Sequence, residues 1–206
     1  MNLANFIVEL IAAAGTVGAV IVALALALGS FQKPKLVIEF RQEEPYCRKW
    51  PMIADKWEGV IWRYWIRIKV TNKGRGVAKE CKGKLVDIKK IKDDGSLDQF
   101  QPFDPVILRW IDYRENTYGP IDLNREEPSY LNIIYTMEPG ESEIQKGRAK
   151  WAWICGDIEG KGIEGKLPVG RYTLTLVIYG ENADPVQKQY KLTWDGEWDK
   201  ITILPM

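Results

Sequence analysis

The chain has 206 residues, of which 46% are hydrophobic and 28% are charged, and its formal net charge is +1. This composition is typical of a globular chain of about one domain and excludes a disordered chain, a collagen and a disulfide-rich scaffold. The chain contains no histidine, which excludes Ser-His-Asp and Cys-His catalytic sites and histidine-bound zinc or haem. The three cysteines, Cys47, Cys81 and Cys155, are odd in number and widely spaced, so we expect buried thiols, no metal site and no cofactor.

A helix is the first element that the sequence predicts, because residues 10–29 form a run without a charged side chain. As a helix this run would span about 30 Å, the thickness of the hydrocarbon core of a bilayer. A cleaved signal peptide is the alternative, since three alternating alanines near the end of the run form an A-x-A pattern. No basic residue precedes the run and the run exceeds the usual length of a signal sequence, so a single N-terminal transmembrane helix at 1–30 is favoured, followed by a short linker at 31–34.

Small residues recur every four positions within the predicted anchor. In a bilayer such a stripe lets helices approach closely, so we expect self-association of the anchor or pairing with a partner helix. The alternative is that alanine and glycine are simply frequent in membrane helices. The residues of this possible helix-packing stripe are Gly15, Ala19, Ala23 and Ala27.

Beyond residue 34 the hydrophobic period changes to two, which is typical of strands. The clearest case is 60–70, where apolar side chains alternate with Arg63, Arg67 and Lys69. Many short strands separated by turns, without an amphipathic helix, predict a mainly β chain folded as one antiparallel β-sandwich over 35–206. The tryptophans at 62, 110 and 194 are predicted core residues. The predicted strands are 35–41, 60–70, 77–91, 106–110, 130–137, 150–155, 171–179 and 186–194.

Two segments resemble known sandwich modules. Val70-Thr-Asn-Lys-Gly-Arg-Gly-Val-Ala78 is similar to the V-x-N-x-G-x-x-x-A strand and turn of CARDB-type immunoglobulin-like modules. Leu167-Pro-Val-Gly-Arg-Tyr-Thr-Leu-Thr-Leu-Val-Ile178 resembles the P-G-x-Y-x-L-x-V start of a late strand in such sandwiches, with one valine inserted between proline and glycine. The layout of anchor and sandwich also resembles membrane-anchored archaeal and bacterial proteins without an assigned activity. The resemblance implies an immunoglobulin-like fold and no particular activity.

Basic residues lie asymmetrically about the predicted anchor, since five follow it within 20 residues and none precedes it. The positive-inside rule therefore predicts a single-pass protein of the cell membrane with its sandwich in the cytoplasm. A sandwich outside the cell is the alternative, because immunoglobulin-like modules are commonly displayed there. If the first strand leaves the membrane and 60–70 returns toward it, the next turn lies near the lipid bilayer. The possible headgroup contacts are then Lys33, Lys35, Lys73 and Arg75.

The long connection at 42–59 mixes aromatic and basic residues and is predicted to be a loop. Long loops are often functional, and Trp and Arg are frequent anchors of protein interfaces. Packing of the loop against itself and binding of a sugar are the alternatives. The possible partner loop comprises Tyr46, Arg48, Trp50 and Trp57.

Three classes of function fit these features. The favoured hypothesis is a membrane-tethered immunoglobulin-like interaction or structural module without catalytic activity. A pilin-like filament subunit is the first alternative, because Glu9 lies just ahead of the long apolar run, although the expected basic leader is missing. A membrane-bound carbohydrate-binding or hydrolytic domain is the second. Nucleic-acid binding is not expected, since the charge beyond the anchor is nearly balanced.

Overall fold

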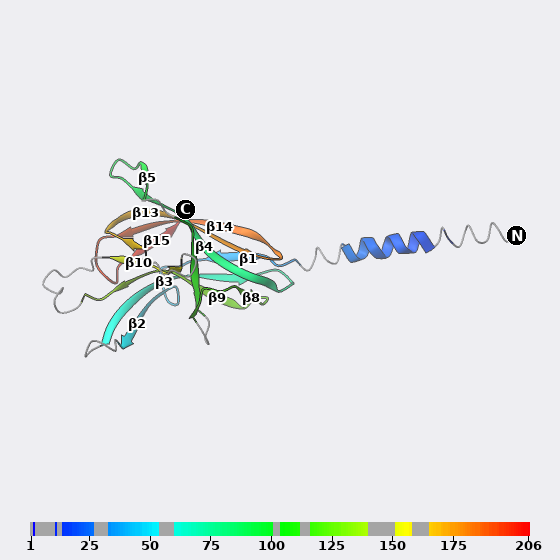
Figure 1. The fold of residues 1–206 in the computed structure, drawn as a ribbon, viewed down its shortest axis with the longest axis horizontal. Coiled ribbons are helices and arrows are strands. Elements are labelled where there is room, and N and C mark those ends of the chain that lie inside the picture. Colours follow the sequence, from blue (N-terminus) through cyan, green and yellow to red (C-terminus); the bar gives the residue numbers. More distant parts are fainter. Residues whose placement is uncertain are drawn as a thin grey trace.

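The computed structural model of the chain describes residues 2, 11, 14–26, 33–53, 60–100, 104–111, 116–139, 151–157 and 165–206. Beyond residue 33 the described regular structure is formed by strands (Figure 1), which confirms the prediction of a mainly β chain. The strands are β1 (Leu36–Glu39), β2 (Cys47–Ile53), β3 (Val60–Asn72), β4 (Ala78–Ile91), β5 (Leu97–Gln99), β6 (Val106–Ile111), β7 (Asn116–Thr117), β8 (Ile121–Leu123), β9 (Pro128–Met137), β10 (Ala152–Ile154), β11 (Gly156–Asp157), β12 (Lys166–Leu167), β13 (Gly170–Gly180), β14 (Ala183–Trp194) and β15 (Thr202–Pro205).

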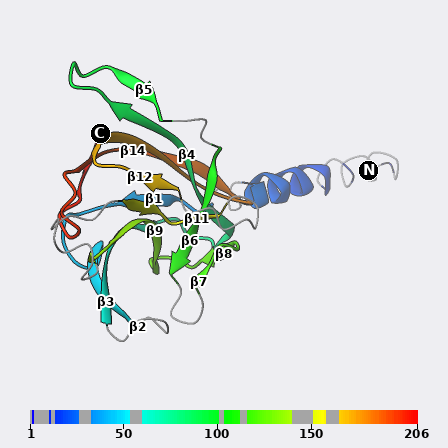
Figure 2. The ribbon, with the colours of Figure 1, turned by 60° about the vertical axis from the view of Figure 1, so that its left-hand side comes forward.

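The strands form one antiparallel, curled sheet in the order β1-β3-β9-β6-β4-β13-β14-β15. The sheet turns at β6, which pairs with β9 through its last residues and with β4 through its first ones. The half with β3 and β9 therefore faces the half with β13 and β14 across a core (Figure 2). The curl brings the end of the order back to its beginning, where Lys33 before β1 forms a 2.8 Å ion pair with Asp184 of β14.

The core is filled by alternate side chains of the strands, as period-two sequences require. Ile66, Ile68 and Val70 of β3 are fully buried, and so are Trp110 of β6 and, to within 2%, Trp194 of β14. The prediction of core tryptophans is therefore confirmed at positions 110 and 194.

The prediction was wrong at the start of β3, where Trp62 is 40% exposed and Val60 is 56% exposed. The alternation of apolar residues continues there, but among the described residues the core does not enclose these side chains. This part of β3 pairs with β2 as a two-stranded arm (Figure 1).

Within the predicted loop at 42–59, Cys47–Ile53 form strand β2, while 54–59 lie outside the described residues. β1 pairs with the last residues of β3 and β2 pairs with its first ones, so β1 and β2 follow one another along a single edge of β3. Proline within Cys47–Ile53 and the Lys and Arg residues obscured this pattern in the sequence. The strand forms because proline is tolerated at a sheet edge, where its missing N–H costs no ladder hydrogen bond.

Helical structure occurs at 14–26, within the predicted anchor, and its side chains are exposed. Gly15, Ala19 and Ala23 all lie in this helix, four residues apart and so near one face. Ala27, the last member of the predicted stripe, lies outside the described residues. Within the part of the chain that the structure describes, no helix has both the length and the apolar character needed to cross a membrane.

The cysteines are buried free thiols, which confirms that prediction. Burial raises the pKa of the Cys81 thiol to about 11, with a smaller contribution from the neighbouring Asp122 carboxylate. Burial also raises the pKa of Cys47.

We therefore expect the native protein to resist Ellman's reagent at pH 8, because the thiolate is the reactive form and is scarce when the pKa is high. All three thiols should react once the chain is unfolded in guanidinium chloride. A native protein that releases three equivalents of chromophore within minutes would contradict the buried placement of Cys47, Cys81 and Cys155.

Candidate binding surface

An uninterrupted row of side chains crosses five strands on the outer side of the sheet. The row is perpendicular to the strands, because each member is the direct register partner of the next. Its three central members are aromatic and its two ends are basic. The row runs Arg48 (β2), Trp65 (β3), Tyr135 (β9), Trp153 (β10) and Lys166 (β12).

The aromatic rings of this row pack on one another. The ring centroids of Trp65 and Tyr135 are 4.8 Å apart, and the ring of Tyr135 is stacked on Trp153 at 6.2 Å with an interplanar angle of 10°. Cations cover the rings, with the Arg63 guanidinium 4.7 Å from the Tyr135 centroid and the Lys166 ammonium 4.6 Å from the Trp153 centroid. Such contacts are worth about 0.5–2 kcal/mol each, so this surface is held in one arrangement.

Further arginines flank the row on the same side of the sheet. Arg63 and Arg67 lie two residues before and after Trp65 on β3, and side chains two apart share a face. Arg67 is opposite Asn132 of β9, and Asn132 is opposite Arg109 of β6. The Arg67 Nε donates to Asn132 Oδ1 at 3.2 Å.

Within the described part of the chain, no carboxylate pairs with these guanidinium groups. Among the described residues no ion pair is formed by Arg48, Arg63, Arg67 or Arg109, although exposed lysines elsewhere are paired. The Nε atoms of Arg63 and Arg109 are buried and have no hydrogen-bond partner within the described part of the chain. Burial lowers the pKa of the Arg67 guanidinium, and the neighbouring charge of Arg48 lowers it further. Among the described residues the arginines of this surface therefore form no ion pair, and their charge is partly desolvated.

We refer to this surface as the arginine–aromatic face. It comprises Arg48, Arg63, Trp65, Arg67, Arg109, Tyr135, Trp153 and Lys166. An unpaired, half-buried guanidinium is costly unless an acceptor completes its hydrogen bonds. The arrangement therefore fits the binding of an anionic partner and contains no acid–base pair for catalysis among its members.

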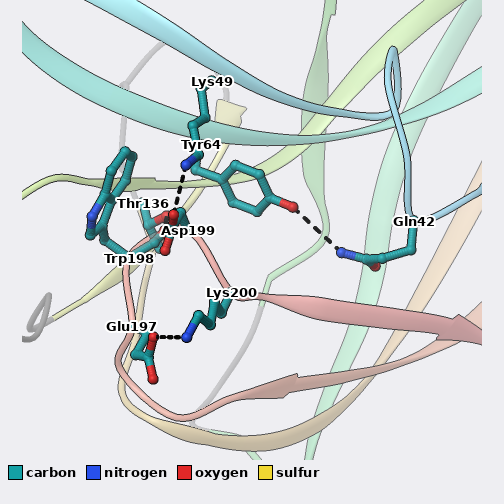
Figure 3. Close-up of polar contacts among 8 residues, drawn as sticks. All are labelled: Gln42, Lys49, Tyr64, Thr136, Glu197, Trp198, Asp199 and Lys200. Atoms are coloured by element: carbon teal, nitrogen blue, oxygen red, sulfur yellow. Dashed lines mark hydrogen bonds and ion pairs between the residues drawn. The ribbon is translucent and has the colours of Figure 1, made fainter.

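The inner side of the same strands holds the loop between β14 and β15 (Figure 3). Lys49, Tyr64 and Thr136 are register partners across β2, β3 and β9. Lys49 Nζ is 2.7 Å from Asp199 Oδ2, and the Thr136 hydroxyl donates to the carbonyl of Trp198. These contacts attach the loop to the inner side of the strands that carry the arginine–aromatic face.

Gln42 completes this attachment. Its Nε2 donates to the Ile201 carbonyl at 2.7 Å, and its Oε1 accepts from the Ile203 N–H at 3.1 Å. The side chain thus takes the place of a strand neighbour for the start of β15. Gln42 also lies 3.5 Å from the Tyr64 hydroxyl (Figure 3).

The residues of the predicted partner loop differ in their exposure. Tyr46 is 5% exposed and packs edge-on against Phe40 and Tyr130, so it belongs to the core. Trp50 is 47% exposed, with the Arg48 guanidinium 4.5 Å from its ring centroid. Arg48 therefore belongs to the arginine–aromatic face and Trp50 borders it, whereas Trp57 lies outside the described residues.

The predicted headgroup residues gather at the opposite end of the sheet. The Lys73 N–H donates to the Lys35 carbonyl at 2.7 Å, which brings the turn after β3 against the chain before β1. Lys33 is paired with Asp184, and Lys73 with Glu126 at 2.6 Å. Lys35 and Arg75 are exposed and form no ion pair with the described residues. The grouping is observed, and contact with lipid stays a prediction.

Buried Asn72 holds that turn. Its Oδ1 accepts from the N–H groups of Lys35 and Gly74, both at 3.0 Å. Its Nδ2 donates to the carbonyls of Gly76 at 2.6 Å and Leu123 at 3.1 Å. A Cβ on Gly74 would lie 2.4 Å from the Lys33 carbonyl oxygen, so only glycine fits the close approach of the two segments.

Comparisons with known proteins gave no relationship: no family, no curated protein and no solved structure matches the chain. The described residues also contain no group of three or more acidic or cysteine side chains positioned to hold a metal ion.

Proposed function

We propose that the chain is a membrane-tethered interaction module without catalytic activity, whose β-domain is an immunoglobulin-like sandwich. The uncharged run at 10–29, with its exposed helix at 14–26, supports a tether. The basic residues after that run favour a cytoplasmic domain. Lys33 and the arm of β2 and β3 lie at opposite ends of the sheet, so a tether at residue 33 leaves the arm directed away from the membrane (Figure 1).

We further propose that the partner binds to the arginine–aromatic face. The observation that supports this most strongly is the set of four arginines without carboxylate partners among the described residues. A folded domain gains nothing by holding half-buried guanidinium groups unpaired, whereas interfaces are enriched in Arg and Trp. The exposed Trp50 at the border of this face fits the same role.

Photo-crosslinking in membranes tests the location of this interface. We expect p-benzoylphenylalanine in place of Trp50 to yield a discrete adduct in membranes of the producing cell. The same group in place of Leu204 is a matched control, because Leu204 is similarly exposed at 54% but lies on β15, at the other end of the strand order. Adducts of equal yield from both positions, or none from position 50, would contradict an interface on this face.

A further inference from the structure

We propose that the ligand of the arginine–aromatic face is an extended acidic peptide segment, with carboxylates on alternate residues, lying along the outer side of β3. This inference rests on the proposed function and names the chemistry of the partner. It follows from the spacing of the arginine positions, the hydrogen bonding of the guanidinium N–H groups and the packing of the aromatic rings.

The basic groups repeat at the period of an extended chain. Along β3, Arg63 and Arg67 are separated by Trp65, and Arg48 lies directly beside Trp65 on β2. The backbone positions of the three arginines therefore follow one another at steps of two residues, which is about 6.7 Å per step in a strand. An extended peptide places alternate side chains on one side at the same interval, so carboxylates at its first, third and fifth residues meet Arg63, Arg48 and Arg67 in turn.

The donor groups of this face match carboxylates. A guanidinium presents N–H groups in a planar fork that pairs with a carboxylate through two parallel hydrogen bonds. The Nε atoms of Arg63 and Arg109 are buried and have no acceptor among the described residues, so the side-chain hydrogen bonding of these arginines is incomplete. The Arg67 side chain is already oriented by Asn132, so little conformational freedom is lost on binding.

The rings of the face are unsuited to nucleic acid. Binding of single strands relies on free aromatic faces on which bases stack. Here Tyr135 is only 4% exposed, since Trp65 and Trp153 lie against it, and cations cover the outer rings. The near-neutral charge of the chain also lacks the excess of basic residues that a polyanion requires.

Recognition through side chains is favoured over addition of a strand to the sheet. The exposed edge of this region is β2, whose residues Lys49 and Pro51 have their backbone directed away from β3. Lys and Pro on an edge oppose pairing with another strand. The peptide is therefore expected to lie across the sheet surface and not to extend it.

The test uses the detergent-solubilised full chain and three synthetic probes. These are a ten-residue Glu-Thr repeat, the matched Gln-Thr repeat and a ten-nucleotide oligo-dT. We expect calorimetry at low salt to show one-to-one binding of the Glu-Thr repeat and none of the Gln-Thr repeat. The double variant Arg48→Gln/Arg67→Gln should weaken that binding by about tenfold or more, because each substitution removes a charge-assisted contact with the peptide.

The control variant is Lys188→Gln/Lys191→Gln, which removes the same charge from exposed positions on β14. Both double variants should keep the wild-type melting temperature to within a few degrees, and the control should bind the Glu-Thr repeat as wild type does. Tighter binding of oligo-dT, equal loss in both variants, or no binding of the Glu-Thr repeat would overturn the proposal. If none of the probes binds while the adduct at position 50 still forms, the ligand chemistry is wrong but the interface stands.

Discussion

Replacement of Asn72 by alanine is expected to lower the free energy of unfolding by about 3 to 5 kcal/mol, because several buried backbone groups lose their partner at once. Asn72 is fully buried and its side chain makes four hydrogen bonds to backbone groups of three segments. Alanine would leave two N–H groups and two carbonyls without these partners. Urea unfolding of the detergent-solubilised chain, followed by tryptophan fluorescence, measures the change. The signal reports on the β-domain and not on the N-terminal helix, because no tryptophan precedes residue 50.

Asn182→Ala is the matched control for this measurement. Asn182 also bridges two backbone groups, accepting from the Lys79 N–H at 2.8 Å and donating to the Val77 carbonyl at 2.9 Å, but it is exposed. Water replaces its hydrogen bonds, so we expect a loss below about 1 kcal/mol. Similar losses in the two variants would show that Asn72 does not hold the turn in the way described.

Replacement of Trp194 by alanine is expected to lower the free energy of unfolding by about 3 to 5 kcal/mol, because it empties a large core position. Trp194 is 2% exposed, and its indole N–H donates to the Glu197 carbonyl at 2.9 Å. The variant therefore also releases the loop that Lys49 and Thr136 hold from the inner side of β2, β3 and β9. Urea unfolding should show a lower midpoint with an unchanged cooperative transition.

Trp62→Ala is the comparison for Trp194→Ala. Both residues are tryptophans in strands, but Trp62 is 40% exposed. We expect this change to cost less than about 1 kcal/mol, as is usual for surface positions. A loss as large as that of Trp194→Ala would mean that Trp62 is a core residue after all.

The fold was largely predictable from hydrophobic periodicity, and the predictions that were wrong have physical explanations. The strands containing Ile66, Tyr172 and Leu192 were predicted because burial of alternate side chains produces a local pattern. The strand Cys47–Ile53 was missed because an edge strand tolerates Pro and Lys, which are atypical of strands. The exposure of Trp62 depends on where the opposite half of the sheet ends, and no local pattern encodes that.

The candidate surface was predicted only in part. Arg48 and the bordering Trp50 were identified from their residue types, but the remaining members of the arginine–aromatic face come from five strands distant in sequence. One clue was present: Trp65 stands between Arg63 and Arg67 on the polar side of a predicted strand, where a tryptophan has no core to enter. The alignment of Tyr135 and Trp153 beside it depends on the register of pairing, which single-sequence patterns do not specify.

The placement of β1 determines how the domain would bear mechanical load. Tension between a tether at Lys33 and a partner on β3 would pull β1 and β3 in opposite directions along their common axis. The hydrogen bonds of an antiparallel pair are perpendicular to the strands, so those joining Leu36–Glu39 to β3 would be sheared together and not peeled one by one. The ion pair of Lys33 with Asp184 adds a second point of attachment at the loaded end. With a tether at Lys33 and a partner on β3, the domain would thus transmit force between them without first opening its sheet.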